Sequence, residues 1–284
     1  MRTGVVLTVA GLVFSTGCTL FHRAEPPVRV LVLNMHAGKT AAGQSNLDGV
    51  AALVKSSGAD LVLLQEVDRG TARSGGVDQV AVLQKATGYD AAFGASLLHY
   101  GGGEYGIAVL SRGAIGFRST VPLVVSPRQT RAGGSPEPRI AQLVLAMARR
   151  ANWRIVNTHL DPSDGQARAQ EVAQIVQTVA AQQRLTTGPF VVGGDFNSTP
   201  DDPVQRTLKD AGLRDAWAEC GQGDGFTYPS DAPAKRIDYL FLTGDLHCSA
   251  AQVVETQVSD HRPVLVTLSR SGAGDAPVSS NTKP

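Results

Sequence analysis

Cysteine is scarce in this chain of 284 residues, which contains 3. No Cys-x-x-Cys spacing occurs, so a zinc site built from thiolates is not expected. Cys220 and Cys248 could form a disulfide in an oxidising compartment. The sequence leaves this pairing open, because the distance and direction of the two side chains decide it.

An excess of basic residues is also missing. The chain has 26 Lys and Arg against 25 Asp and Glu, a formal net charge of +1. Proteins that hold nucleic acid mainly by its phosphate backbone usually show a basic excess or a basic run. The balance therefore disfavours a tight, processive DNA-binding protein and leaves room for an enzyme with a small catalytic footprint.

Two common catalytic motifs are absent as well. The chain has no Gly-x-Ser-x-Gly elbow, so a serine nucleophile of that class is not expected. The run Gly101-Gly102-Gly103 lacks the Lys-Ser/Thr ending of a phosphate-binding loop. A flexible turn explains this run better.

The first residues have the layout of an export signal. Arg2 gives a positive start, Val5 to Phe14 form a short apolar stretch, and small residues precede Cys18. The stretch is shorter than the roughly 20 residues of a membrane-spanning helix. The ending Ser15-Thr16-Gly17-Cys18 resembles a bacterial lipoprotein cleavage site, although Ser15 stands where leucine is usual. We expect residues 1–18 to be a signal peptide and the exported protein to be membrane-anchored through a lipid on Cys18, facing the periplasm or the cell exterior; an ordinary secretory signal is the alternative.

From Val28 onward, strand-like apolar runs alternate with helical patterns. This alternation predicts one α/β domain at 28–268, after a tether at 19–27 and before a disordered tail at 269–284 that has little apolar content. Residues 126–138, rich in Pro, Gly and Arg, are expected to form a long loop. The expected strands are 28–34, 60–67, 105–111, 139–148, 153–160, 190–194, 236–242 and 262–268. The expected helices are one capped by Asn46, one at 78–87 that stops at Gly88, the longest around 172–179, and a short one opened by Asp202 and Pro203.

Polar side chains gather at the ends of these expected strands, where α/β enzymes build their sites. Any one of them alone has an ordinary structural explanation, such as capping a turn. Their combination is what carries information. The residues are Asn34, His36, Glu66, His159, Asp161, Asp195, Asn197, Asp238, Asp260 and His261.

Six motifs that contain these residues occur in a fixed order across almost the whole domain. They are Asn-Met-His-Ala-Gly, Leu-Gln-Glu-Val, Asn-Thr-His-Leu-Asp, Gly-Asp-Phe-Asn, Arg-Ile-Asp-Tyr-Leu and Ser-Asp-His-Arg-Pro-Val. With them, the chain resembles the endonuclease/exonuclease/phosphatase (DNase I-like) superfamily from about Val30 to Leu268. The resemblance implies a four-layer α/β/β/α sandwich, in which two packed mixed β-sheets are flanked by helices.

Phosphate esters are negatively charged, so hydrolysis needs a cation on the phosphoryl oxygens, a base for water and help for the leaving oxygen. Hard oxygen ligands suit Mg²⁺ or Mn²⁺ as that cation. Glu66 is the main candidate ligand. By resemblance, Asn34 and Asp260 are further metal ligands, and Asp195 and Asn197 complete or flank the site.

His261 is the expected general base, or a histidine that orients the phosphate. By resemblance, Asp238 binds its ring and fixes the tautomer. His159 is expected to bind a phosphoryl oxygen or to assist the leaving group, and the direction of proton transfer between the two histidines stays open. Asn197 is expected to orient water or a phosphoryl oxygen. The weaker candidates for the substrate-binding edge are Tyr105, Arg139 and Asn157.

The family does not fix the substrate. The expected function is a Mg²⁺- or Mn²⁺-dependent phosphodiesterase that acts outside the cytoplasm on a lipid headgroup or a small phosphodiester. An exported DNase I-like endonuclease, a phosphomonoesterase and a non-catalytic binding module on the same fold are the alternatives. The expected partners are a phosphate-ester substrate (lipid, nucleic acid or small molecule) and a membrane through the lipid anchor; no protein partner is inferred.

Overall fold

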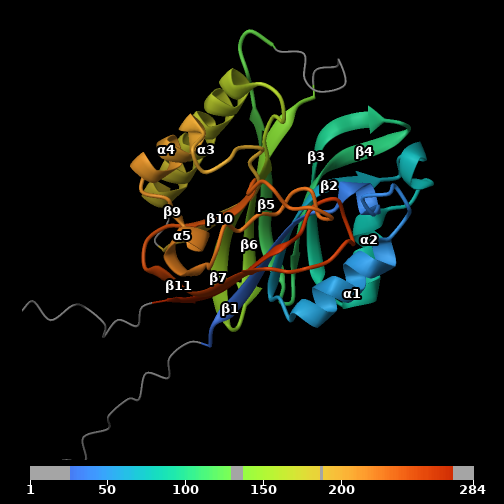
Figure 1. The fold of residues 1–284 in the computed structure, drawn as a ribbon, viewed down its shortest axis with the longest axis horizontal. Coiled ribbons are helices and arrows are strands. Elements are labelled where there is room, and N and C mark those ends of the chain that lie inside the picture. Colours follow the sequence, from blue (N-terminus) through green and yellow to red (C-terminus); the bar gives the residue numbers. More distant parts are fainter. Residues whose placement is uncertain (1–25, 129–136, 186–187, 271–284) are drawn as a thin grey trace, which may run out of the picture.

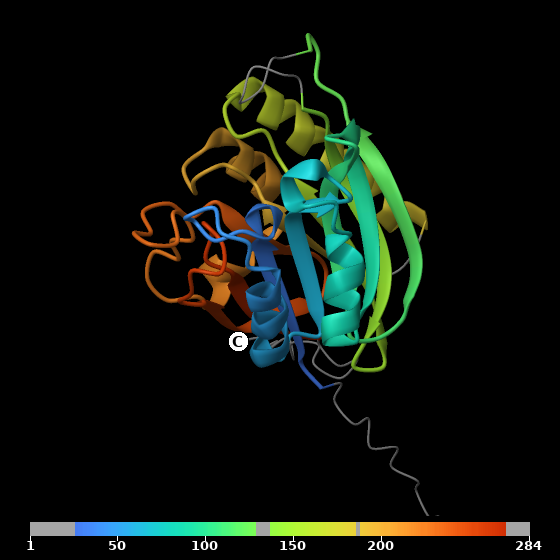
Figure 2. The same ribbon diagram turned by 90° about the vertical axis from the view of Figure 1, so that its right-hand side faces the viewer.

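Two six-stranded sheets form the centre of the molecule (Figures 1 and 2). The computed structural model describes residues 26–128, 137–185 and 188–270. The first sheet has the order β11-β12-β1-β2-β4-β3 and the second β5-β6-β7-β8-β10-β9. The first sheet consists of β1 (Val28–Asn34), β2 (Leu61–Arg69), β3 (Asp90–Tyr100), β4 (Gly103–Ser111), β11 (Leu246–Val253) and β12 (Val264–Arg270). The second consists of β5 (Ile115–Leu123), β6 (Arg139–Ala148), β7 (Ala151–His159), β8 (Phe190–Asp195), β9 (Arg214–Asp215) and β10 (Asp238–Leu242).

Each sheet is mixed. β1 pairs with β2, and β7 with β8, in parallel, whereas the other neighbours are antiparallel. The helices are α1 (Leu47–Ser57), α2 (Gln79–Thr87), α3 (Gly165–Leu185), α4 (Pro203–Asp210) and α5 (Ala216–Cys220), with short 3-10 turns η1 (His36–Gly38) and η2 (Ala72–Ser74). The expected four-layer sandwich of two mixed sheets flanked by helices is confirmed.

Alternation along β1 shows why the layers form. Val30 and Val32 point into the core between the two sheets, whereas Leu31 and Leu33 point into a second core beneath α1 and α2. A third core lies between the second sheet and helices α3 and α4. Because both faces of the central strands are covered, these strands consist of nearly continuous apolar runs.

Three helices have an N-cap residue that the sequence predicts, and the side chain caps the helix in two of them. Asp78 and Asp202 cap α2 and α4 through their side-chain oxygens, and Gly88 ends α2 in a left-handed conformation. Asn46 holds the N-cap position of α1, but its side chain does not cap the helix. Its amide donates instead to the carbonyl of Val258, 3.2 Å away, so the expected cap bond is wrong.

The strands that the sequence did not predict are β3, β5, β9 and β11. All four are edge strands of their sheets. β5 and β11 alternate or expose most of their side chains, and an edge strand needs no continuous apolar run. The expected long loop at 126–138 has no helix or strand in its described parts, 126–128 and 137–138.

A disulfide between Cys220 and Cys248 ties α5 to the edge strand β11, with Cα atoms 5.8 Å apart. It therefore joins parts packed on different sheets.

The expected signal peptide, most of the tether and residues 271–284 lie outside the described residues. Ser269 and Arg270, which were expected to begin a disordered tail, are the last residues of β12. Within the described ranges, no helix is long and apolar enough to cross a membrane.

Candidate active site

The site is built on a row of three residues that stand side by side on neighbouring strands. His159, the last residue of β7, pairs with Asp195, the last residue of β8. Asp195 in turn pairs with Asp238, the first residue of β10. The register of three strands thus brings together side chains that are far apart in the sequence, and all three are buried.

Gly194 allows this row to form. Its φ is +143°, and a Cβ placed on it would lie 1.9 Å from the carbonyl oxygen of Thr158. Any other residue would push β8 away from β7 at the point where His159 and Asp195 meet. The glycine before Asp195 in the Gly-Asp-Phe-Asn motif is therefore required by the close approach of two strands.

Asn34 connects this row to the first sheet. From the end of β1, its amide nitrogen donates to Glu66 Oε1 and to Asp195 Oδ2, both at 3.1 Å. Glu66 lies in an irregularity of the β2–β4 pairing, between Leu64 and Val67, with a φ of +54°. Asn197 also has a left-handed φ, +47°. Left-handed conformations are rare for residues other than glycine and concentrate at functional sites.

Asn197 is held at both ends. Its backbone N–H donates to Asp195 Oδ1 at 2.9 Å, and its amide nitrogen donates to the Leu160 carbonyl at 3.0 Å. The side-chain orientation of Asn197 is therefore fixed before any substrate binds.

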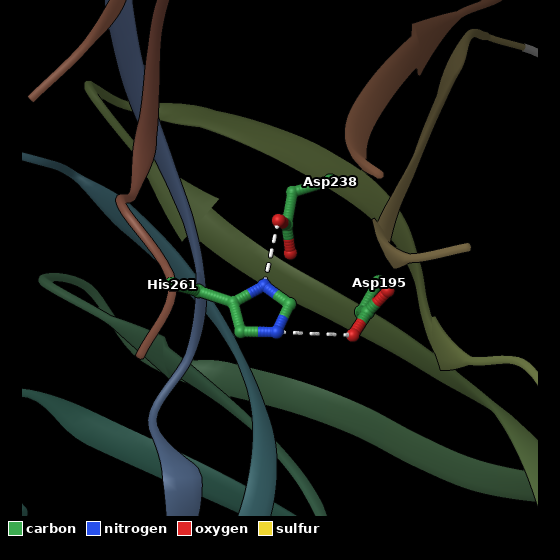
Figure 3. Close-up of side chains that lie close together, drawn as sticks. All are labelled: Asp195, Asp238 and His261. Carbon is green, nitrogen blue, oxygen red and sulfur yellow. Dashed lines mark hydrogen bonds and ion pairs between the residues drawn. The ribbon is translucent and has the colours of Figure 1, made fainter. Parts of the chain in front are cut away.

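His261 lies against the row from the loop that precedes β12 (Figure 3). Its Nδ1 is 2.8 Å from Asp238 Oδ2, and its Nε2 is 3.8 Å from Asp195 Oδ2. His159 Nε2 lies 3.5 Å from the same Asp195 oxygen. Asp195 therefore stands between the two histidines, and the expected contact between Asp238 and His261 is present.

The electrostatic environment separates the two histidines. Burial alone lowers the pKa of His261, but the charge and hydrogen bond of Asp238 outweigh it, and with Asp195 and Asp260 they raise the pKa to about 10. The pKa of His159 is lowered well below its usual value by burial and by the charges of Arg139 and His261. At neutral pH without bound cation, His261 is charged and His159 is neutral.

Asp195 has an unusual proton affinity for a carboxyl group. Burial and the nearby charge of Asp238 raise its pKa to about 7, although His261 and the hydrogen bonds from Asn34 and Asn197 act in the opposite direction. A buried negative charge here is therefore costly and would be stabilised by a nearby cation.

Tyr105 on β4 and Arg139 on β6 line the active-site cavity together with His159. Both are buried, and Arg139 forms an ion pair with Glu137 at 2.7 Å. Burial and the charge of Glu66 raise the pKa of Tyr105, so its hydroxyl stays protonated and can donate a hydrogen bond.

These side chains line one cavity of about 570 Å³. Among the residues expected from the sequence, the cavity is lined by Asn34, Glu66, Tyr105, Arg139, His159, Asp195, Asn197, Asp260 and His261. Sequence reasoning missed Glu137, Arg168, Tyr228 and Lys235, which also line it. The Tyr228 ring packs on His261 with centroids 4.9 Å apart; an aromatic residue in a Gly/Pro-rich loop gives no periodic signal that would have identified it.

Asn157 was expected at the substrate-binding edge, and the structure places it elsewhere. It is fully buried, accepts a hydrogen bond from Gln65, and donates to the carbonyls of Leu64 and Ala108. Leu64 and Ala108 belong to the first sheet and Asn157 to the second. Its side chain therefore links the two sheets, because a buried polar amide must satisfy its hydrogen bonds.

A comparison with protein-family models matches residues 32–261 to a model described as the endonuclease/exonuclease/phosphatase family. The chain belongs to this family. Enzymes of the family generally hydrolyse phosphoester bonds, and the matched residues include the site from Asn34 to His261 and all strands except β12 and the start of β1. No curated protein matches the sequence.

Several solved structures share the family fold. A family member from Bacteroides thetaiotaomicron has 18% identity and a TM-score of 0.72, covering 87% of this chain and 99% of that one. A mannosyl-6-phosphatase from the same organism has 18% identity and a TM-score of 0.71, covering 85% and 99%. The human Nocturnin catalytic domain with bound sulfate has 19% identity and a TM-score of 0.63, covering 87% and 96%. At these identities, the similarity establishes the fold.

The family is typically dependent on a divalent metal, and the donor atoms present fit such an ion. Glu66, Asp195 and Asp260 line one cavity together with Asn34, whose Oδ1 accepts from the backbone N–H of His36; carboxylate and amide oxygens are the donors that Mg²⁺ and Mn²⁺ prefer. Asp238 Oδ1 is buried with no hydrogen-bond partner. Asp195, Asp238 and His261 could also hold a metal by their spacing, but Asp238 and His261 already bind each other. The set around Glu66 is the better ligand set.

The raised pKa of His261 predicts a pH dependence of stability. In the presence of chelator, the folded protein keeps a proton that the unfolded chain loses near 6.5, so the free energy of unfolding should fall as pH rises from about 6.5 to about 10. Asp195 acts in a lower window: the unfolded chain loses this proton near 3.8 and the folded protein near 7, so its contribution to the free energy of unfolding falls between these pH values. Urea midpoints measured across the upper window should show a weaker fall for His261→Asn than for the wild type. Equal slopes in the two proteins would contradict the assigned proton.

Proposed function

We propose that this protein is a Mg²⁺- or Mn²⁺-dependent phosphodiesterase that acts outside the cytoplasm. The observation that carries the proposal is the convergence of Glu66, His159, Asp195 and His261 in one cavity, with Asp238 bound to the ring of His261. Carboxylates for a hard cation and an oriented histidine are the groups that hydrolysis of a phosphodiester requires.

The residues divide the chemical work as follows. Asp238 holds His261 by Nδ1, which leaves Nε2 directed toward the reacting region. His261 takes the proton of the attacking water once the negative charge of the neighbouring carboxylates is neutralised. A divalent cation, when bound, would supply positive charge to those carboxylates and to the phosphoryl oxygens. Glu66, Asn34 and Asp260 would hold it.

The remaining groups orient the phosphate. Arg139 and the protonated hydroxyl of Tyr105 lie beside His159 and can donate hydrogen bonds to phosphoryl oxygens. His159 stays neutral and donates to a phosphoryl or leaving-group oxygen. Asn197 is fixed by Asp195 and Leu160. Its amide oxygen is left to accept a hydrogen bond from water.

The substrate is a small phosphodiester or a lipid headgroup. A phosphomonoester is the second candidate, because one structural neighbour is named a mannosyl-6-phosphatase and the cavity is large enough for a sugar phosphate. An exported endonuclease remains the alternative among nucleic-acid substrates. A non-catalytic binding module would require loss of a ligand or of the base, and each of these positions holds a competent residue.

The test is a side-by-side assay of the purified full chain on a generic phosphodiester, sphingomyelin-type lipid, supercoiled DNA and inositol phosphates. Turnover should require Mg²⁺ or Mn²⁺ and stop when chelator is added. Activity that chelator does not affect would count against the metal mechanism. No turnover of any of these phosphoesters would favour the binding module.

We propose in addition that the protein is an exported lipoprotein. The Cys220–Cys248 disulfide supports export, because disulfides persist mainly in oxidising compartments. Cys18→Ala should release the protein from the membrane fraction into the soluble fraction, since it removes the site of lipid attachment. Immunoblots of fractionated cells measure this. A wild-type protein already found in the soluble fraction would contradict the lipid anchor.

A further inference from the structure

The end of the domain opposite the active site carries a group of basic side chains, which we call the basal face. It is formed where β1 and β2 begin, β4 and β12 end, β6 turns into β7, and α1 finishes (Figure 2). The active-site residues lie at the other ends of the same strands. The basic residues of the basal face are Arg29, Lys55, Arg112, Arg149, Arg150 and Arg270.

Contacts around Asp60 show that these elements meet. Asp60 accepts from the backbone N–H of Arg29 at 3.0 Å and forms ion pairs with Arg149 at 2.9 Å and Arg112 at 3.7 Å. It is almost completely buried. Arg270 donates to the carbonyl of Asn152 at the start of β7. One buried carboxylate therefore gathers arginines from three separate parts of the chain.

The positive charge on this face is only partly neutralised. Two acidic side chains at this end are already paired with arginines: Asp60 with Arg149 and Arg112, and Glu219 with Arg214, which also binds the Leu246 carbonyl beside Arg270. Lys55 and Arg150 are exposed, and the described part of the chain offers them no ion pair. The carboxylates of the active site lie at the opposite end. The net charge of +1 therefore hides a group of basic side chains at this end.

We propose that the basal face binds a membrane surface that contains anionic phospholipid. Basic side chains close to such a surface are attracted to its negative potential. The chain enters the domain at this face, where Pro26 and Pro27 precede β1, so a lipid on Cys18 would bring the face to the bilayer. Met147, which is 47% exposed beside Arg149, adds apolar contact. The charge argument does not require that lipid.

The position of the face disfavours nucleic acid as its partner. β1 has 7 residues, so Asn34 in the active site is roughly 20 Å from Val28 at the basal face. Phosphates of a duplex bound to the basal face would be out of reach of the cavity. A membrane-bound domain would instead open its cavity away from the bilayer. On the proposed function, this orientation favours a soluble phosphodiester over a headgroup of the same membrane.

Vesicle co-sedimentation tests the proposal with the full chain carrying Cys18→Ala, so that no lipid anchor masks the electrostatic contact. This protein should bind vesicles of phosphatidylcholine mixed with phosphatidylglycerol, bind phosphatidylcholine alone weakly, and dissociate at high salt. Adding Arg29→Gln, Lys55→Gln and Arg150→Gln should lower the partition coefficient about 100-fold. These three side chains form no ion pair with Asp60, so their replacement leaves that buried carboxylate paired.

The matched control carries Lys39→Gln, Arg118→Gln and Arg206→Gln, which remove the same charge away from the basal face, and it should bind anionic vesicles nearly as well as the parent. Equal binding to both vesicle types, or equal loss in both triple variants, would overturn the proposal. So would loss of duplex DNA binding in the basal triple variant with vesicle binding unchanged. Turnover of a soluble phosphodiester should be the same in the parent and both triple variants. If none of them hydrolyses it, the proposed function fails while the vesicle result still decides this inference.

Discussion

His261→Ala should lower turnover of a phosphodiester by at least ~100-fold. The substitution removes the ring that Asp238 orients and that lies 3.8 Å from Asp195, so no other group at this position can take the proton of water. Steady-state kinetics with saturating Mg²⁺ measure the effect. The loss should fall mainly on kcat, because the metal ligands and the Arg139 side of the cavity are unchanged.

Two companions make this result interpretable. Asp238→Asn keeps the shape of the side chain but removes its charge, so it should give an intermediate loss of kcat and a changed pH profile. His99→Ala, at an exposed position of β3, should leave turnover unchanged. Near wild-type turnover in His261→Ala, together with a normal circular dichroism spectrum, would exclude His261 as the base.

The central strands of the fold could be predicted from the sequence, and the edge strands could not. β1, β2, β4, β6, β7, β8, β10 and β12 are covered on both faces, and their apolar runs are visible in the chain. β5 shows the opposite case. It is an edge strand with mostly exposed side chains, and its residues Ile115–Leu123 include glycine, proline and arginine. Only pairing with β6 makes it a strand, and that pairing is a property of the folded molecule.

The site divides in a similar way. Asp195, Asp238 and His159 could be proposed because each ends or begins a recognisable strand, and strand ends meet at the edge of a sheet. That they form one row depends on the register of three strands, which the sequence does not display. Tyr228 and Lys235 reach the cavity from an irregular loop whose path is set by tertiary contacts, such as the packing of Tyr228 on His261.

The same limit explains why Asn157 was placed at the substrate edge. Asn157 and His159 are two residues apart on β7, so their side chains share one face of the strand. That face covers the core between the sheets along most of its length and opens into the cavity only at its end. Asn157 lies two residues before that end, within the core. There its amide joins the two sheets and cannot reach a substrate.

The net charge of the whole chain does not describe the charge of its individual faces. A balance of 26 basic and 25 acidic residues gave no sign of an electrostatic surface. Folding nevertheless gathers Arg112, Arg149 and Arg150 from separate loops at the basal face, whereas the cavity contains both carboxylates and the basic residues Arg139, Arg168 and Lys235. An argument from composition about binding partners therefore constrains the whole molecule and says nothing about any one face.

Glu66→Gln should raise the Mg²⁺ concentration needed for half-maximal activity by at least ~10-fold, in the range observed when groups that support a metal ligand are lost. Glutamine keeps the length of the side chain, and its Oε1 can still accept from Asn34, as Glu66 does at 3.1 Å. The left-handed backbone at this position is also unchanged. The difference between the proteins is then one negative charge next to the proposed ion.

Isothermal titration with Mn²⁺ gives a readout that does not depend on turnover, and it should show the same weakening. Glu255→Gln, which removes a carboxylate whose side chain is 87% exposed, should bind the metal as the wild type does. High Mg²⁺ should restore much of the activity of Glu66→Gln, because binding is weakened and the base is intact, whereas it should not restore His261→Ala. If Glu66→Gln bound Mn²⁺ as tightly as the wild type, the ion would have to sit elsewhere in the cavity, and the group formed by Asp195, Asp238 and His261 would become its best position.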